Sequence, residues 1–116
     1  MKTTLSFLII CFSLNTVSTN FSKETSIELL VTAIKEDNFN YIISVLQSKQ
    51  LNVNQAYNGK SLLFYAIDFD NAEMVNLLVR YGARLDLTNK AGETPLECAK
   101  SQNKILALAE LIVIMA

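Results

Sequence analysis

The sequence predicts an all-α fold in which short helix pairs stack as a solenoid with projecting loops. One observation is an internal repeat, because residues 59–91 and 92–116 carry glycines, small residues and large apolar residues at the same places, 33 residues apart. A second is that the 116 residues include only one Pro and three Gly, too few for the many tight turns of an all-β chain.

The composition excludes several classes of protein. Apolar residues make up 51% of the chain and charged residues 18%, which is unlike a disordered segment. Ten basic and eleven acidic residues give a net charge of −1, so the total charge does not favour nucleic acid as a partner. The chain contains no His, the commonest general base and metal ligand. We therefore expect no enzyme activity, no metal and no other cofactor.

Residues 1–18 have the layout of a signal peptide. A positive start precedes an apolar run at residues 5–14, and Thr16 and Ser18 are small residues suited to cleavage after position 18. The run is shorter than the about 20 residues that span a bilayer. We expect an exported protein, periplasmic or secreted, with residues 19–24 as a flexible mature N-terminus and no membrane span in the mature chain. The alternative is an N-terminal helix that packs on the domain.

The repeat divides residues 25–116 into one domain of three units, at about 25–56, 57–88 and 89–116. In the first unit, Thr25 and Glu28 have the spacing of a capping box that begins a helix. The end of this unit is shifted, because residues 52–54 align with residues 84–86 at a separation one residue shorter than the period.

The second and third units carry clearer helix signals. Ser61 is expected to cap the first helix of the second unit, and Gly82 is expected to end its second helix in the left-handed conformation. In the third unit Thr94 caps, Pro95 suits the first helical position, and Glu97 completes a capping box. A helix pair of this size cannot bury its own apolar face, so about three stacked units are the minimum.

These features resemble the ankyrin repeat, in its 33-residue period, its T-P-L helix start and its Y-G-A helix end. The corresponding segments are TPLECA at residues 94–99, SLLFYA at residues 61–66 and, in the first unit, only Leu30 and Ala33. The family's His is replaced by Val31, Phe64 and Glu97. We expect packing of Phe64 and Val31 to compensate, and Cys98 to be a small buried hydrophobe.

The resemblance implies a non-catalytic module that binds a partner protein through its loop tips and the surfaces of its first helices. The residues that it assigns to this surface are Tyr57, Asn58, Lys60, Asp68, Phe69, Lys90, Glu93 and Gln102. Tyr57 and Phe69 are the expected anchors, since aromatic residues dominate interface energies. The alternative is that Tyr57 covers a loop and Phe69 tucks under the neighbouring unit.

Two other functions remain open. One is a secreted effector that acts on a host protein. The other is a small enzyme in which a carboxylate pair, Asp68 and Asp70, supplies the general acid and the general base. A cation bound by Asp68, Asp70 and Glu73 is disfavoured, because the Asp-x-Asp-x-Asp-Gly pattern of a calcium-binding loop is absent.

Residues 105–116 contain one charge in twelve positions, whereas terminal solenoid units usually present a polar outer face. Three interpretations compete. The last helix is covered by a partner or by a second copy of the chain, it docks on a membrane surface although it lacks a basic face, or the sequence is the remnant of a longer array.

Overall fold

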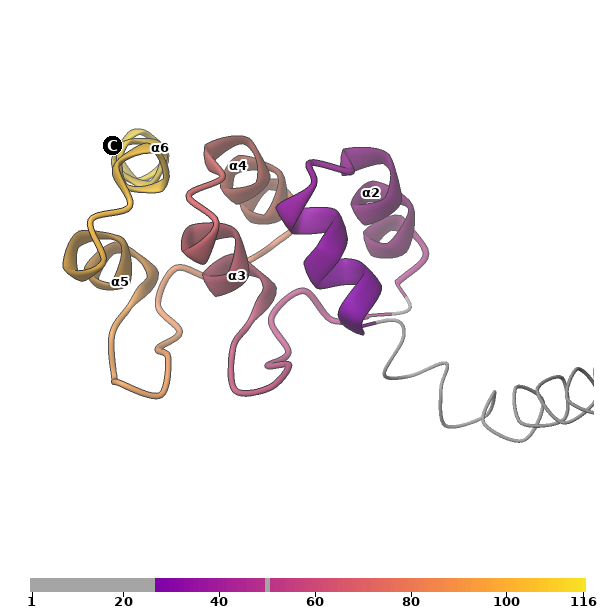
Figure 1. The fold of residues 1–116 in the computed structure, drawn as a ribbon, viewed down its shortest axis with the longest axis horizontal. Coiled ribbons are helices and arrows are strands. Elements are labelled where there is room, and N and C mark those ends of the chain that lie inside the picture. Colours follow the sequence, from indigo (N-terminus) through magenta and orange to yellow (C-terminus); the bar gives the residue numbers. More distant parts are fainter. Residues whose placement is uncertain (1–26, 50) are drawn as a thin grey trace, which may run out of the picture.

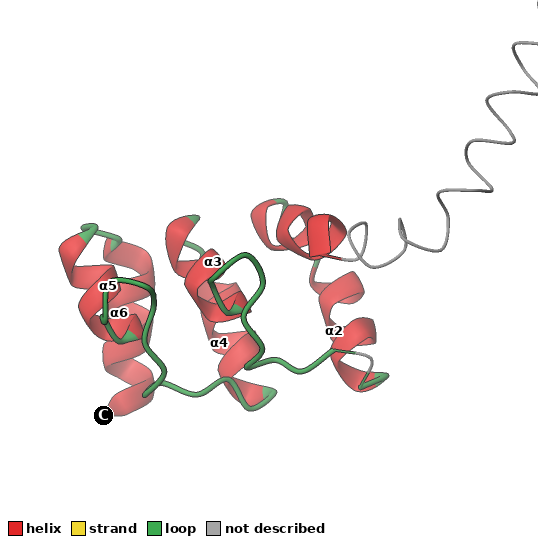
Figure 2. Ribbon diagram, turned by 90° about the horizontal axis from the view of Figure 1, so that it is seen from below, coloured by secondary structure: helices red, strands yellow, loops and turns green. Residues whose placement is uncertain are grey.

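The computed structural model describes residues 27–49 and 51–116, which form a row of three helix pairs (Figures 1 and 2). The first pair is helical residues 27–35 with α2 (Phe39–Gln47). The next pairs are α3 (Leu62–Asp68) with α4 (Ala72–Arg80), and α5 (Pro95–Ser101) with α6 (Ile105–Met115). Within the described part of the chain there is no strand, only an isolated bridge between Tyr57 and Lys60.

The expected all-α solenoid of helix pairs is thereby confirmed, and each pair falls inside one of the three predicted units. The predicted signal peptide 1–18, the segment 19–24 and the cap at Thr25 lie outside the described residues. Among the residues that are described, no helix is long and apolar enough to cross a membrane.

The helices form two rows that enclose the core. In Figure 1, α2, α4 and α6 form the upper row, and residues 27–35 with α3 and α5 form the lower row, from which the two long loops project downward. Large, fully buried side chains come from both rows, among them Leu30, Ile34, Ile42, Leu62, Leu63, Ile67, Met74, Leu78 and Leu111. None of the described buried residues is polar or charged. The seams between units are therefore held by the hydrophobic effect.

The start of α5 matches its sequence signals. Thr94 Oγ1 accepts a hydrogen bond from the Glu97 amide at 3.3 Å, and Glu97 Oε1 accepts from the Thr94 amide at 3.2 Å and its hydroxyl at 2.9 Å. Ser61 is the N-cap residue of α3, as expected, but the prediction that its side chain caps the helix is wrong, since it makes no side-chain cap hydrogen bond. Phe64, which stands where Glu97 stands one unit later, is buried at 3% exposure and cannot complete a box.

The capping box makes stability depend on pH. The backbone and hydroxyl hydrogen bonds from Thr94 lower the pKa of Glu97 below its usual 4.5. Such a carboxylate stabilises the fold above its unfolded-state pKa, and this contribution is lost as the pH falls through the folded-state value. Between about pH 5 and pH 3, we expect the wild type to lose more stability than Glu97→Gln, which accepts the same bonds but does not titrate. Urea unfolding of both proteins across this range measures the difference, and parallel curves contradict the prediction.

The turns between the helices of each pair share a left-handed residue. Asp37, Asp70 and Asn103 have φ angles of 60°, 51° and 57° and lie at the same place in successive units. Asp and Asn tolerate this conformation better than other non-glycine residues do. The residue that follows is the N-cap of the second helix, and in the first two units it is an Asn whose side chain accepts from the third residue of that helix.

In the third unit the N-cap residue is Lys104, whose side chain cannot accept a hydrogen bond. The carboxylate of Asp70, in the preceding unit, takes over this role and accepts from the Ala107 amide at 2.9 Å. One unit therefore caps the second helix of the next, which ties the two units together at their turns.

Removal of this cap tests the arrangement. We expect Asp70→Ala to lower the free energy of unfolding by about 1 kcal/mol more than Asn103→Ala does. Asn103 is the matched control because it has the same left-handed backbone but no side-chain hydrogen bond among those formed by the described residues. Adding Lys104→Asn supplies a local cap and should restore stability to Asp70→Ala more than it stabilises the wild type. Equal effects of the two alanine substitutions in urea melts contradict the cap.

The two projecting loops explain the shifted register of the sequence repeat. In the first loop Tyr57 and Lys60 exchange backbone hydrogen bonds of 2.6 and 3.1 Å around Asn58 and Gly59, both at positive φ. An Asn-Gly pair is typical of such a two-residue hairpin. In the second loop Asn89 bonds to Glu93, which encloses three residues. The second hairpin therefore holds one residue more than the first. Residues before the hairpins correspond at a separation of 32, and this extra residue returns the separation to 33 at Gly59 and Gly92.

Gly82 ends α4 as predicted, with a φ of 97° and an Ala83 amide that donates to the Leu78 carbonyl at 3.0 Å. The Asn54 side chain then links the first unit to this turn, because it donates to the Gly82 carbonyl at 3.0 Å and accepts from the Arg84 amide at 2.8 Å.

Candidate functional site

The outer face of α3 holds a polar cluster at the base of the first loop. The Lys60 ammonium pairs with the Asp68 carboxylate and lies 5.4 Å from the centre of the Tyr65 ring. The hydrogen bond with Asp68 is the main cause that raises the pKa of Lys60. The Tyr65 hydroxyl donates to the Tyr57 carbonyl at 2.8 Å. These contacts fix the loop against the helix. Sequence reasoning missed Tyr65, although its spacing from Ser61 and Asp68 places all three on one helix face.

Tyr57 lies under the loop, with only 6% of its surface exposed. Burial raises the pKa of its hydroxyl, which has no hydrogen-bond partner among the described residues. The ring therefore supports the hairpin and offers little area to a partner, in agreement with the alternative interpretation that Tyr57 covers a loop.

The tips of the two loops meet. Asn58 is exposed at the first tip, and the end of the Lys90 side chain packs against Gly59, where a Cβ atom would collide with Lys90 Cε. Lys90 thus brings its ammonium group to the first tip, whereas the Lys60 ammonium pairs with Asp68 over Tyr65 of α3. Glu93 is half-buried and accepts a hydrogen bond from the Asn89 side chain at 3.3 Å, so it is engaged within its own loop.

Gln102, the C-cap of α5, is exposed, and its side-chain amide donates to the Cys98 thiol at 3.3 Å. Cys98 itself is 1% exposed, as expected for a small buried hydrophobe. Burial, and then the nearby carboxylates of Asp68 and Glu93, raise the pKa of its thiol. A thiol in this environment is a poor nucleophile, because the thiolate is the reactive form.

Phe69 follows the last residue of α3 and is 37% exposed, so it does not tuck fully under a neighbouring unit. With Leu106 of α6 and Lys35 it lines a hollow of about 320 Å³ beside the turns between helices. Phe69 is separated from the loop tips by the length of α3, about 10 Å at 1.5 Å per residue. The two expected anchors, Tyr57 and Phe69, therefore do not form one apolar spot.

The carboxylates considered for acid–base chemistry or cation binding point to different partners. Asp68 pairs with Lys60, whereas Asp70 caps α6. Across residues 27–49 and 51–116, no three acidic or Cys side chains come close enough together to hold a metal ion.

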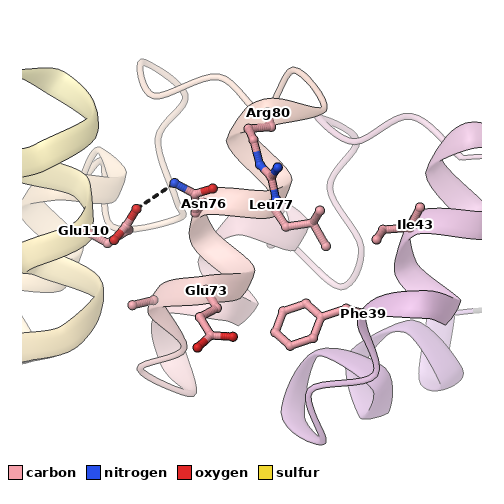
Figure 3. A pocket seen from close by; sticks show the side chains of 8 residues that line it. Phe39, Ile43, Glu73, Asn76, Leu77, Arg80 and Glu110 are labelled. Carbon is pink, nitrogen blue, oxygen red and sulfur yellow. Dashed lines mark hydrogen bonds between the residues drawn. The ribbon is translucent and has the colours of Figure 1, made fainter.

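A second hollow, of about 410 Å³, lies between α2 and α4 (Figure 3). Phe39 and Ile43 of α2 face Leu77 of α4, and Glu73 and Arg80 lie at its rim. Sequence reasoning missed this hollow, because its width depends on how closely two units pack. Asn76 and Glu110 of α6 also line this hollow, and the Asn76 amide donates to Glu110 at 2.7 Å across the seam between α4 and α6.

Taken together, the described residues form a stack of helix pairs that displays loop tips and helix faces, the architecture of a repeat-type binding scaffold. A model of three ankyrin repeats matches the chain at residues 6–89 and again at residues 30–114. The chain belongs to the ankyrin-repeat family. An ankyrin-repeat domain is a protein–protein interaction module, and the family is generally non-catalytic.

Three relatives show the same similarity. An ankyrin repeat protein of Rickettsia bellii (strain RML369-C) is 40% identical over 53 residues, which are 45% of this chain and 32% of the relative. Alpha-latrotoxin-Lg1a of Latrodectus geometricus is 28% identical over 85 residues, 71% of this chain and 6% of the relative. An ankyrin repeat protein of Acanthamoeba polyphaga mimivirus is 32% identical over 66 residues, 56% of this chain and 9% of the relative. The matched regions span no more than about a third of these relatives.

Proposed function

We propose that this protein is an exported module that binds a partner protein through a recognition surface on its loop tips and first helices. The recognition surface consists of Asn58, Lys60, Asp68, Phe69, Lys90 and Gln102. Tyr57 and Glu93 support the loops from within, since one is buried and the other is bonded to its own hairpin.

The observation that carries the proposal is the fixed placement of this surface. The Lys60–Asp68 pair over Tyr65 fixes the first loop against α3, and the contact of Lys90 with Gly59 joins the two loop tips, before any partner binds. A surface ordered in advance loses less conformational entropy on association. Its chemistry, with the exposed Lys90 ammonium at the tips and the Phe69 ring at the other end of α3, suits a partner with an acidic residue opposite the tips and an apolar contact beyond them.

Export is supported by the layout of residues 1–18. Mass spectrometry of the mature protein should find an N-terminus near residue 19. An intact Met1 in the accumulated protein contradicts export by this signal. Recovery from the medium, and not from the periplasm, is the result that favours a secreted effector acting on a host protein.

Site-specific photocrosslinking tests the recognition surface. A crosslinking side chain at Gln102 or Asn58 should capture one protein from the native compartment, whereas the same group at Glu73 or Arg80 of α4 should not. These α4 positions are matched controls because they are also exposed but lie on the other row of helices. Lys90→Glu should then abolish capture at Gln102 while the far-ultraviolet circular dichroism spectrum still shows a folded helical stack. Capture from α4 alone places the binding surface elsewhere and contradicts the proposal.

A further inference from the structure

The helix α6 has an apolar face that no described residue covers. Ala107 and Leu111 are buried against the rest of the stack, and α6 packs on α4 and α5. On its opposite side the large exposed side chains are Ile105 at 62%, Leu106 at 60%, Ile112 at 53%, Val113 at 70% and Met115 at 53%. Five of the seven large apolar residues that are exposed in the described chain therefore lie on this one helix.

The open face carries no charge that could select a charged partner. Glu110 is the one charged residue within α6, and it is half-buried and accepts a hydrogen bond from Asn76 of α4. A membrane surface suits this face poorly, since helices that lie on membranes combine an apolar face with Lys and Arg at its borders. Within α6 there is neither Lys nor Arg.

The order of side chains on this face is symmetric about its centre. At 100° per residue, Ala109 lies in the middle of the exposed arc. Ile105 and Leu106 precede it by four and three residues, and Ile112 and Val113 follow it by three and four. Two such faces that meet antiparallel about Ala109 place each large apolar side chain of one copy against a large apolar side chain of the other. The small Ala109 at the centre allows the two helices to approach closely.

We propose that two copies of this chain associate through α6, with their open faces packed antiparallel about a two-fold axis at Ala109. Such an interface is isologous, so Leu106 of each copy faces Val113 of the other. The exposed side chains of the face provide roughly 500 Å² per copy, and the total of roughly 1,000 Å² lies at the lower limit of specific interfaces. The dimer is therefore expected to be weak and dependent on concentration. The recognition surface lies on the loops and on the row of first helices, and only its Phe69 borders the same hollow as Leu106, so this association through α6 goes beyond the proposed function.

Sedimentation velocity of the isolated chain tests the dimer. The mass of the protein without residues 1–18 should rise from the single-chain value toward twice that value between about 1 µM and about 300 µM. Leu106→Lys and Val113→Glu should each weaken association at least about tenfold, because each buries a charge against an apolar side chain. Both substitutions are at exposed positions, so circular dichroism melts should match the wild type. Leu29→Lys, at an exposed apolar residue near the other end of the stack, is the matched control and should dimerise normally.

Mixing the two variants gives the decisive result. In an antiparallel pair, the introduced ammonium at position 106 meets the introduced carboxylate at position 113, so the mixture should regain the double mass that neither variant reaches alone. A single-chain mass at all concentrations overturns the proposal, as does association that survives both substitutions or a mixture that fails to recover. Binding of a chain that stays single to vesicles of phosphatidylcholine and phosphatidylglycerol also overturns it and assigns the face to a lipid surface.

Discussion

Replacing Leu78 by Ala is expected to lower the free energy of unfolding by about 2–5 kcal/mol. Leu78 lies in α4 at 0% exposure, in the unit that both other units contact. The substitution removes buried methyl groups and leaves a cavity that packed helices fill only in part. A stack of about three units has little stability to spare, so we expect the variant to be largely unfolded near 37 °C.

Urea unfolding followed by far-ultraviolet circular dichroism measures this change. Leu29→Ala is the control, since Leu29 is 48% exposed in the first helix, and its effect should stay within about 0.5 kcal/mol. Similar losses for the two variants would show that α4 does not hold the centre of the core.

Replacing Asn71 by Ala is expected to cost about 2–3 kcal/mol, which is large for a half-buried residue. Its side-chain oxygen caps α4 by accepting from the Met74 amide at 3.1 Å. Its side-chain amide donates to the Ile34 carbonyl at 3.0 Å and to the Asp37 carboxylate, both in the first unit. The substitution therefore removes a helix cap and a link between units, and it leaves a part-buried carbonyl without this donor.

Asn38 is the matched control for this prediction. It occupies the same position one unit earlier and caps α2 by accepting from the Tyr41 amide at 3.3 Å, so Asn38→Ala should cost only about 1 kcal/mol. The difference between the two free energies measures the link between the units. If both substitutions cost the same in urea melts, the bonds from Asn71 to the first unit contribute nothing to stability.

The architecture could be predicted from the sequence because it depends on periodic and local signals. The 33-residue repeat of apolar positions specifies which faces stack, and Thr94, Pro95 and Glu97 specify a helix start within four residues. Gly82 likewise marks a helix end through its own backbone conformation. The links between units were missed, since the contact of Asp70 with Ala107 joins residues 37 positions apart. No local pattern reveals a cap that a neighbouring unit supplies.

The candidate site was predicted less completely. The repeat position identified Lys60 and Asp68, but their pairing over Tyr65 depends on the path of the hairpin. The burial of Tyr57 also follows from that path, because the side of a loop on which a ring lies is decided by backbone angles at Asn58 and Gly59. Surface exposure in loops is therefore the property that sequence position predicts least well.

The hollow between α2 and α4 has a consequence for how the stack opens. The α4 and α6 helices pack closely, whereas α2 meets α4 over a smaller contact. A helix with few contacts to the neighbouring unit opens locally before the rest of the stack does. We expect the amides of α2 to exchange with solvent deuterium through a partial opening that leaves α3 to α6 folded. The side chain of Asn71 donates hydrogen bonds to Ile34 and Asp37, so these bonds must break for the first helix pair to separate from α4. They therefore contribute to the free energy of this partial opening.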